Sequence, residues 1–228
     1  MITQHLIPSV EKRITAWKEL KERKVELADV ALANITISRE FGCEGYPLAE
    51  ALQQILTEKS TDDWMIYDDA LIKSLQADQD LSQHLLKNYG ERNKFLDDLM
   101  DMIASHWQSE EDGFRQITQF IYSLAKKGHG IFVGRGAFSV IKNLDNCYHI
   151  RLKAPLSFRA QKLSKRLKIS EDEATNLAVE KEIERTRFIK RFLNTDFESD
   201  HFHVIYDNQK MTVNEMAENF LQFVGEIK

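Results

Sequence analysis

Cysteine, proline and glycine are all scarce in this chain of 228 residues, which contains two, three and nine of them respectively. The two cysteines, Cys43 and Cys147, lie far apart and form no CxxC pair. This excludes a disulfide framework and a cysteine-rich zinc site, and it is typical of the reducing cytoplasm, where we expect the protein. Because chain breakers are so few, each glycine or proline is informative about where an element ends.

An excess of basic residues and any long apolar run are also missing. The formal net charge is −5, whereas a nucleic-acid-binding domain usually carries a basic excess. No window approaches the roughly 18 uninterrupted apolar residues of a membrane helix, and the first residues lack the basic and apolar segments of a secretory signal. We therefore expect no nucleic-acid partner and no membrane span. Hydrophobic residues make up 43% of the chain, enough for one full core.

Strand and helix patterns alternate along the chain without a linker, a repeat or a low-complexity tract. Short β-branched or apolar runs predict strands at residues 34–38, 64–67, 131–133, 147–152 and 202–206. Apolar spacing predicts a helix at about 8–31 and several helices within 69–127. Prolines mark the start of two more, one from Pro47 to about 58 and one after Pro155, and a further helix follows Gly136 and runs to Lys142. Two capping boxes (Ser170 with Glu173, Thr212 with Glu215) mark the starts of the last two helices.

This alternation predicts right-handed crossovers and a parallel sheet covered by helices on both faces. Ligands bind such sheets beyond the carboxyl ends of the strands. Three turns are candidates for that position, namely those after Ile37, Tyr67 and Val133. In the first of them, Gly42 and Gly45 allow backbone N–H groups to point at a phosphate at a helix N-terminus. The spacing alone is a weak signal, and the lysine and Ser/Thr of a standard Walker A loop are missing.

Four motifs in a fixed order resemble the cytidylate kinase-like family. The segment from Ser38 to Ala49 resembles the family's opening I-S-R-E-(Y/F)-G-S-G-G-R-E-I-A, and Tyr67-Asp68 resembles its strand-end Y-D. Residues 131–137 resemble its V-G-R-G-A segment, and residues 184–191 resemble its arginine-bearing lid helix. The resemblance implies a three-layer α/β fold of the P-loop NTPase kind with a central, mostly parallel sheet. It implies a kinase-like domain at residues 34–228, preceded by a helical extension at 1–33.

The resemblance also implies an activity and a site. The reaction would be phosphoryl transfer from ATP with Mg²⁺ to a nucleoside monophosphate, with CMP as the name-giving acceptor. Such chemistry requires positioned phosphates and surrounding cations rather than covalent catalysis. The implied catalytic residues are Arg39, Asp68, Arg135, Arg185 and Arg187. The implied nucleotide-binding residues are Ser38, Gly42, Cys43, Gly45, Tyr46 and Arg191, the last as part of a lid. No protein ligand for a metal is implied, and homo-oligomerisation is left open.

Two departures from the family pattern support a rival function. Glu44 stands where the family usually has a second glycine, and Tyr46 stands where it usually has arginine. A carboxylate facing a triphosphate would repel it, so the rival is a kinase-derived protein that binds a nucleotide or a protein partner without turnover. A kinase for another small metabolite is a third reading, since nothing in the sequence identifies a base.

Most of these residues also have a purely structural interpretation. Asp68 can cap the helix that follows it, Arg135 can bind carbonyls at a strand end, and the basic residues at 181–191 can form a solvated helix face. Cys43 is either a low-pKa thiol at a helix N-terminus or a plain substitute for serine. The histidines lack metal-ligand spacing, and five aromatic residues are expected in the core: Phe95, Trp107, Phe114, Phe120 and Tyr122.

Overall fold

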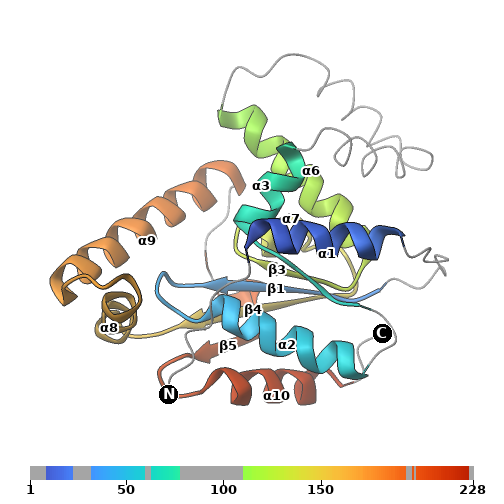
Figure 1. Cartoon of the computed structure of the whole chain (residues 1–228). Helices are drawn as coiled ribbons and strands as arrows, with labels where there is room; N and C mark the ends of the chain where they lie inside the picture. The colour runs from blue at the N-terminus through green and yellow to red at the C-terminus, as the bar shows by residue number, and fades with distance from the viewer. Residues whose placement is uncertain are drawn as a thin grey trace.

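The computed structural model describes residues 9–22, 32–59, 63–77, 110–193, 197 and 199–225 (Figure 1). Its strands are β1 (Asn34–Arg39), β2 (Met65–Tyr67), β3 (Gly130–Val133), β4 (Cys147–Lys153) and β5 (Val204–Asp207). Its α-helices are α1 (Val10–Glu22), α2 (Gly45–Lys59), α3 (Asp69–Ala77), α6 (Glu110–Lys127), α7 (Ala137–Val140), α8 (Leu156–Leu167), α9 (Glu171–Leu193) and α10 (Val213–Val224). A 3₁₀ turn at Ser199–His201 precedes β5.

The five strands form one parallel sheet in the order β2-β3-β1-β4-β5. This confirms the predicted parallel sheet, with β1 at its centre between β3 and β4. Every residue of β1 except Arg39 is buried, because helices cover both faces of the sheet. The carboxyl ends of β2, β3 and β1 therefore lie next to one another at one edge.

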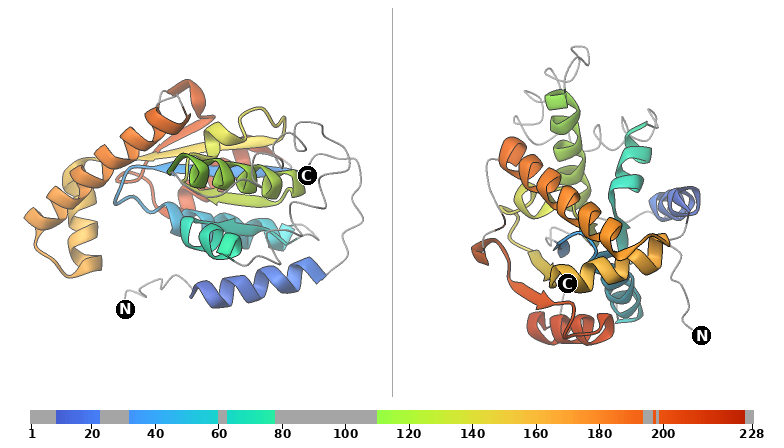
Figure 2. Two further views of the ribbon diagram at one scale, coloured as in Figure 1. Left: turned by 90° about the horizontal axis from the view of Figure 1, so that it is seen from above. Right: turned by 90° about the vertical axis from the view of Figure 1, so that its left-hand side faces the viewer.

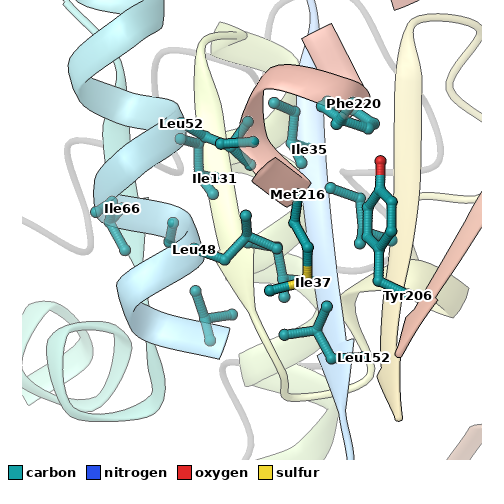
Figure 3. Packing of buried hydrophobic residues seen from close by; sticks show 14 of the residues in the cluster. Ile35, Ile37, Leu48, Leu52, Ile66, Ile131, Leu152, Tyr206, Met216 and Phe220 are labelled. Atoms are coloured by element: carbon teal, nitrogen blue, oxygen red, sulfur yellow. The ribbon is translucent and has the colours of Figure 1, made fainter. Parts of the chain in front are cut away.

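One face of the sheet packs against α2 and α10. Figure 3 shows Ile35 and Ile37 of β1 facing Leu48 and Leu52 of α2, with Phe220 of α10 beside them. All five are fully shielded from solvent. The regular spacing of Leu48 and Leu52 places both on one side of α2, so the burial that holds the helix also fixes where its N-terminus lies.

The opposite face carries α3, α6 and α7 (Figure 2), and Phe120 and Tyr122 of α6 contribute to its core, as expected. Phe95 and Trp107 lie outside the described residues, as does the side chain of Phe114. On this face β1 presents polar side chains that are satisfied internally. Asn34 Nδ2 donates to the carbonyl of Ala125 at 2.8 Å, which ties the centre of the sheet to the end of α6.

Several predicted boundaries differ from the structure. Helix α2 begins at Gly45, two residues before Pro47, which lies within its first turn. The predicted helix to Lys142 ends at Val140, and the last strand begins at Val204 instead of residue 202. The N-terminal helix covers Val10–Glu22, and residues 23–31 of that prediction lie outside the described residues. Residues 78–109 of the predicted helical stretch also lie outside them.

Both predicted capping boxes are present. Thr212 and Glu215 exchange hydrogen bonds at the start of α10, and Ser170 and Glu173 do so at the start of α9. Helices α8 and α9 form a hairpin that buries Ala160, Ala174 and Ala178 between them. Small side chains allow the two helices to approach closely. In Figure 1 this hairpin lies beyond the carboxyl ends of the strands.

A buried histidine makes the fold sensitive to acid. His149 Nδ1 lies 2.8 Å from Thr36 Oγ1, and burial, aided by the charges of His203 and His201, lowers the pKa of His149 to about 4. Between pH 6.5 and pH 4, His149 therefore binds a proton in the unfolded chain, where its pKa is near 6.5, but stays neutral in the folded chain. We expect the free energy of unfolding to fall by up to about 3 kcal/mol between pH 6.5 and pH 4. Urea titrations at several pH values should show this loss of unfolding free energy in the wild type and a smaller loss in His149→Gln. An equal loss in both proteins would contradict the role of His149.

Candidate active site

The three predicted turns come together at the carboxyl edge of the sheet. Arg39 ends β1, Asp68 and Asp69 follow β2, and Arg135 follows β3. Since β2, β3 and β1 are neighbours in the sheet, these side chains share one edge. Helix α2 begins beside them, and the α8–α9 hairpin lies beyond them (Figure 2).

Arg39 lies at the centre of this edge, between two glycines. A Cβ atom on Gly45 would come within 3.0 Å of Arg39 Cδ. A Cβ on Gly134, which has a φ of +82°, would collide with the Arg39 guanidinium. Both glycines therefore make room for this side chain. Burial lowers the pKa of Arg39 to about 10, as does the nearby Arg185, while Asp68 and Asp69 oppose the shift.

Gly42 has a packing role that the sequence pattern did not predict. Its φ is +102°, and a Cβ there would lie 2.9 Å from Arg159 Cβ on α8. Arg159 is itself buried, and it donates from Nη1 to the carbonyl of Phe41 at 3.1 Å and from Nε to the carbonyl of Ala154 at 2.9 Å. The glycine turn is thus held against α8. The N–H groups of Gly45 and Tyr46 belong to the first turn of α2, where intrahelical acceptors do not exist.

The carboxylate of Glu44 is already engaged within the chain. It accepts from Lys162 Nζ at 3.2 Å and from Asn208 Nδ2 at 3.2 Å. The backbone N–H of Glu44 donates to Asn208 Oδ1 at 2.7 Å. Its charge is therefore paired with the Lys162 ammonium, a partner that the expectation of a carboxylate facing a triphosphate did not include. Sequence analysis missed Lys162 and Asn208, because neither lies in a motif near the loop.

Helix α9 is tied directly to the loop. Glu182 Oε2 accepts from the backbone N–H of Phe41 at 2.9 Å. Arg185 Nη1 donates to the carbonyl of Arg39 and pairs with Glu182 Oε2 at 3.1 Å. Burial lowers the pKa of Arg185, and the charge of Glu182 opposes this. The Glu182 carboxylate thus occupies the kind of position on a loop N–H that an anionic ligand would take. The sequence analysis did not include Glu182 among the predicted site residues.

The other predicted arginines of α9 face elsewhere. At 3.6 residues per turn, Arg187 projects roughly 200° around the helix from Arg185. It is exposed and, with Lys190, lines an apolar groove of about 500 Å³ between α8 and α9. Arg191 is exposed in the last turn. Lys181 pairs with Glu184 at 2.8 Å, so this part of α9 is the solvated face that was the alternative interpretation.

The two aspartates after β2 are both paired. Asp68 Oδ1 accepts from the backbone N–H of Leu71 at 2.9 Å, which is the predicted helix cap. Asp68 also lies 2.7 Å from Arg13 Nη1. Asp69 pairs with Arg135, whose φ of 55° places it in the left-handed region between two glycines. Arg135 is therefore held by a carboxylate beside Arg39.

The remaining predicted residues of the loop are largely enclosed. Ser38 is buried at the end of β1. Burial raises the pKa of Cys43 to about 12, which argues against the interpretation as a low-pKa thiol. Tyr46 is half-buried, and burial raises its pKa while Arg13 opposes the shift.

An additional buried cation lies behind the loop. Arg151 of β4 is only 4% exposed, and its guanidinium carbon lies 4.0 Å from the centre of the Phe197 ring. Nothing in its sequence context distinguished it from a strand residue. Its burial on the sheet face toward α7 became evident only from the fold.

No group of three histidine, cysteine or acidic side chains among the described residues can hold a metal ion. A helix long and apolar enough to cross a membrane is likewise not found in the described part of the chain.

Comparisons with known proteins yield a matching family model and similar folds. Residues 34–210 match a model described as the cytidylate kinase-like family. The crystal structure of an uncharacterized protein from Eubacterium ventriosum is similar, with a TM-score of 0.63 and 17% identity over 84% of this chain and 97% of that chain. A shikimate kinase from Bacteroides thetaiotaomicron has a TM-score of 0.49 and 11% identity over 84% of this chain and 98% of that chain. No curated protein matches the chain. The TM-score of 0.63 supports the fold described above, a three-layer α/β arrangement with a parallel sheet between helices.

Proposed function

Because the chain belongs to the cytidylate kinase-like family, we propose that it transfers the γ-phosphoryl group of ATP to a nucleoside monophosphate, with CMP as the leading acceptor. In this reaction an acceptor phosphate oxygen bonds to the γ-phosphorus while the bond to the ADP oxygen breaks. The protein has to hold both nucleotides in line and to neutralise the transferring group.

One observation carries the proposal: three arginines from separate segments lie at the carboxyl edge of the sheet, two of them beside the start of α2. Arg39 lies across Gly45 and Gly134, Arg185 reaches the carbonyl of Arg39 from α9, and Arg135 follows β3 beside Asp69. Cations and helix N–H groups fixed before the reaction stabilise developing phosphate charge without reorganising. We assign Arg39 and Arg185 to the transferring group and Arg135 to the acceptor side.

The remaining predicted residues fit binding roles. The N–H groups of Gly45 and Tyr46 suit a donor phosphate at the helix N-terminus. Mg²⁺ commonly takes one or two carboxylates plus phosphate oxygens, and Asp68 and Asp69 are the carboxylates at this edge. Both are paired with arginines, so we assign the metal mainly to the nucleotide phosphates. When bound, it would supply charge neutralisation there.

A second function is supported by a specific observation. Glu182 already occupies the N–H of Phe41, and Asn208 occupies that of Glu44. A loop whose N–H groups are satisfied internally gains less from a phosphate, because each new hydrogen bond replaces an existing one. This favours a kinase-derived binder without turnover as the alternative.

A panel of nucleoside monophosphates with Mg-ATP, read out as ADP formation and as phosphorylated acceptor, distinguishes the two functions. We expect acceptor-dependent ADP formation, highest with CMP. ADP release without a phosphorylated acceptor would indicate hydrolysis only. Calorimetric binding of ATP with no product from any acceptor would support the binder, and the absence of both binding and product would refute both functions.

A further inference from the structure

Helix α1 lies outside the segment that matches the family model, yet one of its side chains reaches the site edge. The side chain of Arg13 is only 10% exposed, and its Nη1 lies 2.7 Å from Asp68 Oδ1. Its guanidinium carbon is 5.7 Å from the centre of the Tyr46 ring. A single residue of α1 therefore contacts both the turn after β2 and the first turn of α2.

The position of Arg13 is fixed by its neighbours. The backbone N–H of Arg13 donates to the carbonyl of Ser9 at 3.2 Å, and the N–H of Lys12 donates to Ser9 Oγ at 3.3 Å, so Ser9 caps the helix. Ile14 packs against the core cluster that contains Leu71 of α3. Helix α1 thus packs on α3 with Arg13 directed at the Asp68 carboxylate.

The packing of α1 on α3 does not by itself require a buried arginine beside Asp68. Arg13 Nε and Nη1 are buried and, within the described part of the chain, make no hydrogen bond of good geometry. Burying a guanidinium that is satisfied mainly by one ion pair costs more than burying an apolar side chain of similar volume. Asp68 Oδ1 also accepts from the backbone N–H of Leu71 and so caps α3 without Arg13. What Arg13 adds is a fixed charge that orients the carboxylate.

We propose that Arg13 is a positioning residue of the acceptor side, which holds the carboxylate of Asp68 in place, so that α1 is part of the functional unit. The inference rests on the proposed function, because Asp68 acts only if an acceptor binds there. Arg39 and Arg13 then face Asp68 from two segments that are distant in sequence. An acceptor group that donates a hydrogen bond to Asp68 would meet a carboxylate that lies beside both cations.

The test compares Arg13→Ala, Arg13→Lys and Lys12→Ala in the full chain. Lys12 is the matched control, since it is the adjacent cation on the exposed side of α1. We expect Arg13→Ala to raise the KM for CMP at least about 10-fold while the KM for Mg-ATP changes less than about twofold, as suits loss of a charge-assisted contact. Arg13→Lys should recover part of the loss, and Lys12→Ala should behave like the wild type.

Hydrogen exchange at the Leu71 amide gives a second readout that requires no substrate. Loss of Arg13 should speed exchange there, because the carboxylate that accepts this N–H loses its second anchor. An unchanged KM for CMP in Arg13→Ala, or an equal rise for both nucleotides, would overturn the proposal. If the wild type phosphorylates no acceptor, the proposed function fails, and wild-type exchange at Leu71 in Arg13→Ala would then overturn the positioning role as well. If Arg13→Ala does not fold, the same KM values and the same exchange rate are compared between Arg13→Lys and Arg13→Gln.

Discussion

Arg39→Met is expected to lower kcat/KM for phosphoryl transfer by about 10²–10³-fold, the range that accompanies loss of one preorganised cation or donor at a transition state. The guanidinium lies between Gly45 and Gly134 at the start of α2, and no other predicted arginine occupies that space. Methionine keeps the aliphatic part of the side chain that lies against Gly45 and removes the guanidinium that lies against Gly134. Steady-state kinetics with Mg-ATP and CMP measures the loss.

Thermal unfolding separates this effect from a folding defect. Burial already opposes the charge of Arg39, as its lowered pKa shows, so replacing it with an apolar side chain should leave stability unchanged or slightly raised. Arg166→Met on the exposed side of α8 is the control. A variant of Arg39 that retains wild-type transfer would remove Arg39 from the mechanism. A parallel loss of stability and activity would mean that it is structural.

Arg185→Lys is expected to lower kcat/KM by about 10–100-fold, although charge is retained. Arg185 Nη1 bonds both the carbonyl of Arg39 and the carboxylate of Glu182, which a planar guanidinium can do while still presenting other N–H groups to a phosphate. The ammonium of lysine is a single point charge and cannot reproduce this fork. Transfer assays test the loss, together with hydrogen exchange of residues 180–193 with and without a bisubstrate analogue.

Arg187→Lys is the matched comparison on the same helix. Because Arg187 is exposed in the groove between α8 and α9 and projects roughly 200° around the helix from Arg185, we expect a smaller loss than for Arg185. Equal losses would indicate that α9 moves when the ligand binds and brings both arginines to it, as a lid does. Wild-type activity in both variants, with exchange that does not respond to the ligand, would leave α9 as a static surface helix.

The strands, the parallel sheet and the three turns at its carboxyl edge could be predicted from the sequence alone. β-branched runs such as Ile35-Thr36-Ile37, ended by glycine turns, are local signals, since propensity and periodicity act over a few residues. The capping boxes at Ser170 and Thr212 are local in the same sense. Boundaries were less accurate. Helix α2 begins two residues before Pro47, because proline is tolerated throughout the first helical turn, where its missing N–H has no intrahelical acceptor.

The partners of the site residues were decided by the tertiary structure. The sequence alone gives Glu44 no partner, and only the fold brings Lys162 and Asn208, more than a hundred residues away, against its carboxylate. Glu182 of α9 likewise contacts the loop, at the backbone N–H of Phe41, although the two residues are 141 positions apart in the sequence. Arg185 and Arg187 looked equivalent in sequence, and helix geometry directs only Arg185 to the loop. Composition and periodicity determine which elements form, whereas the charge environment of each residue depends on contacts between distant segments that no local pattern encodes.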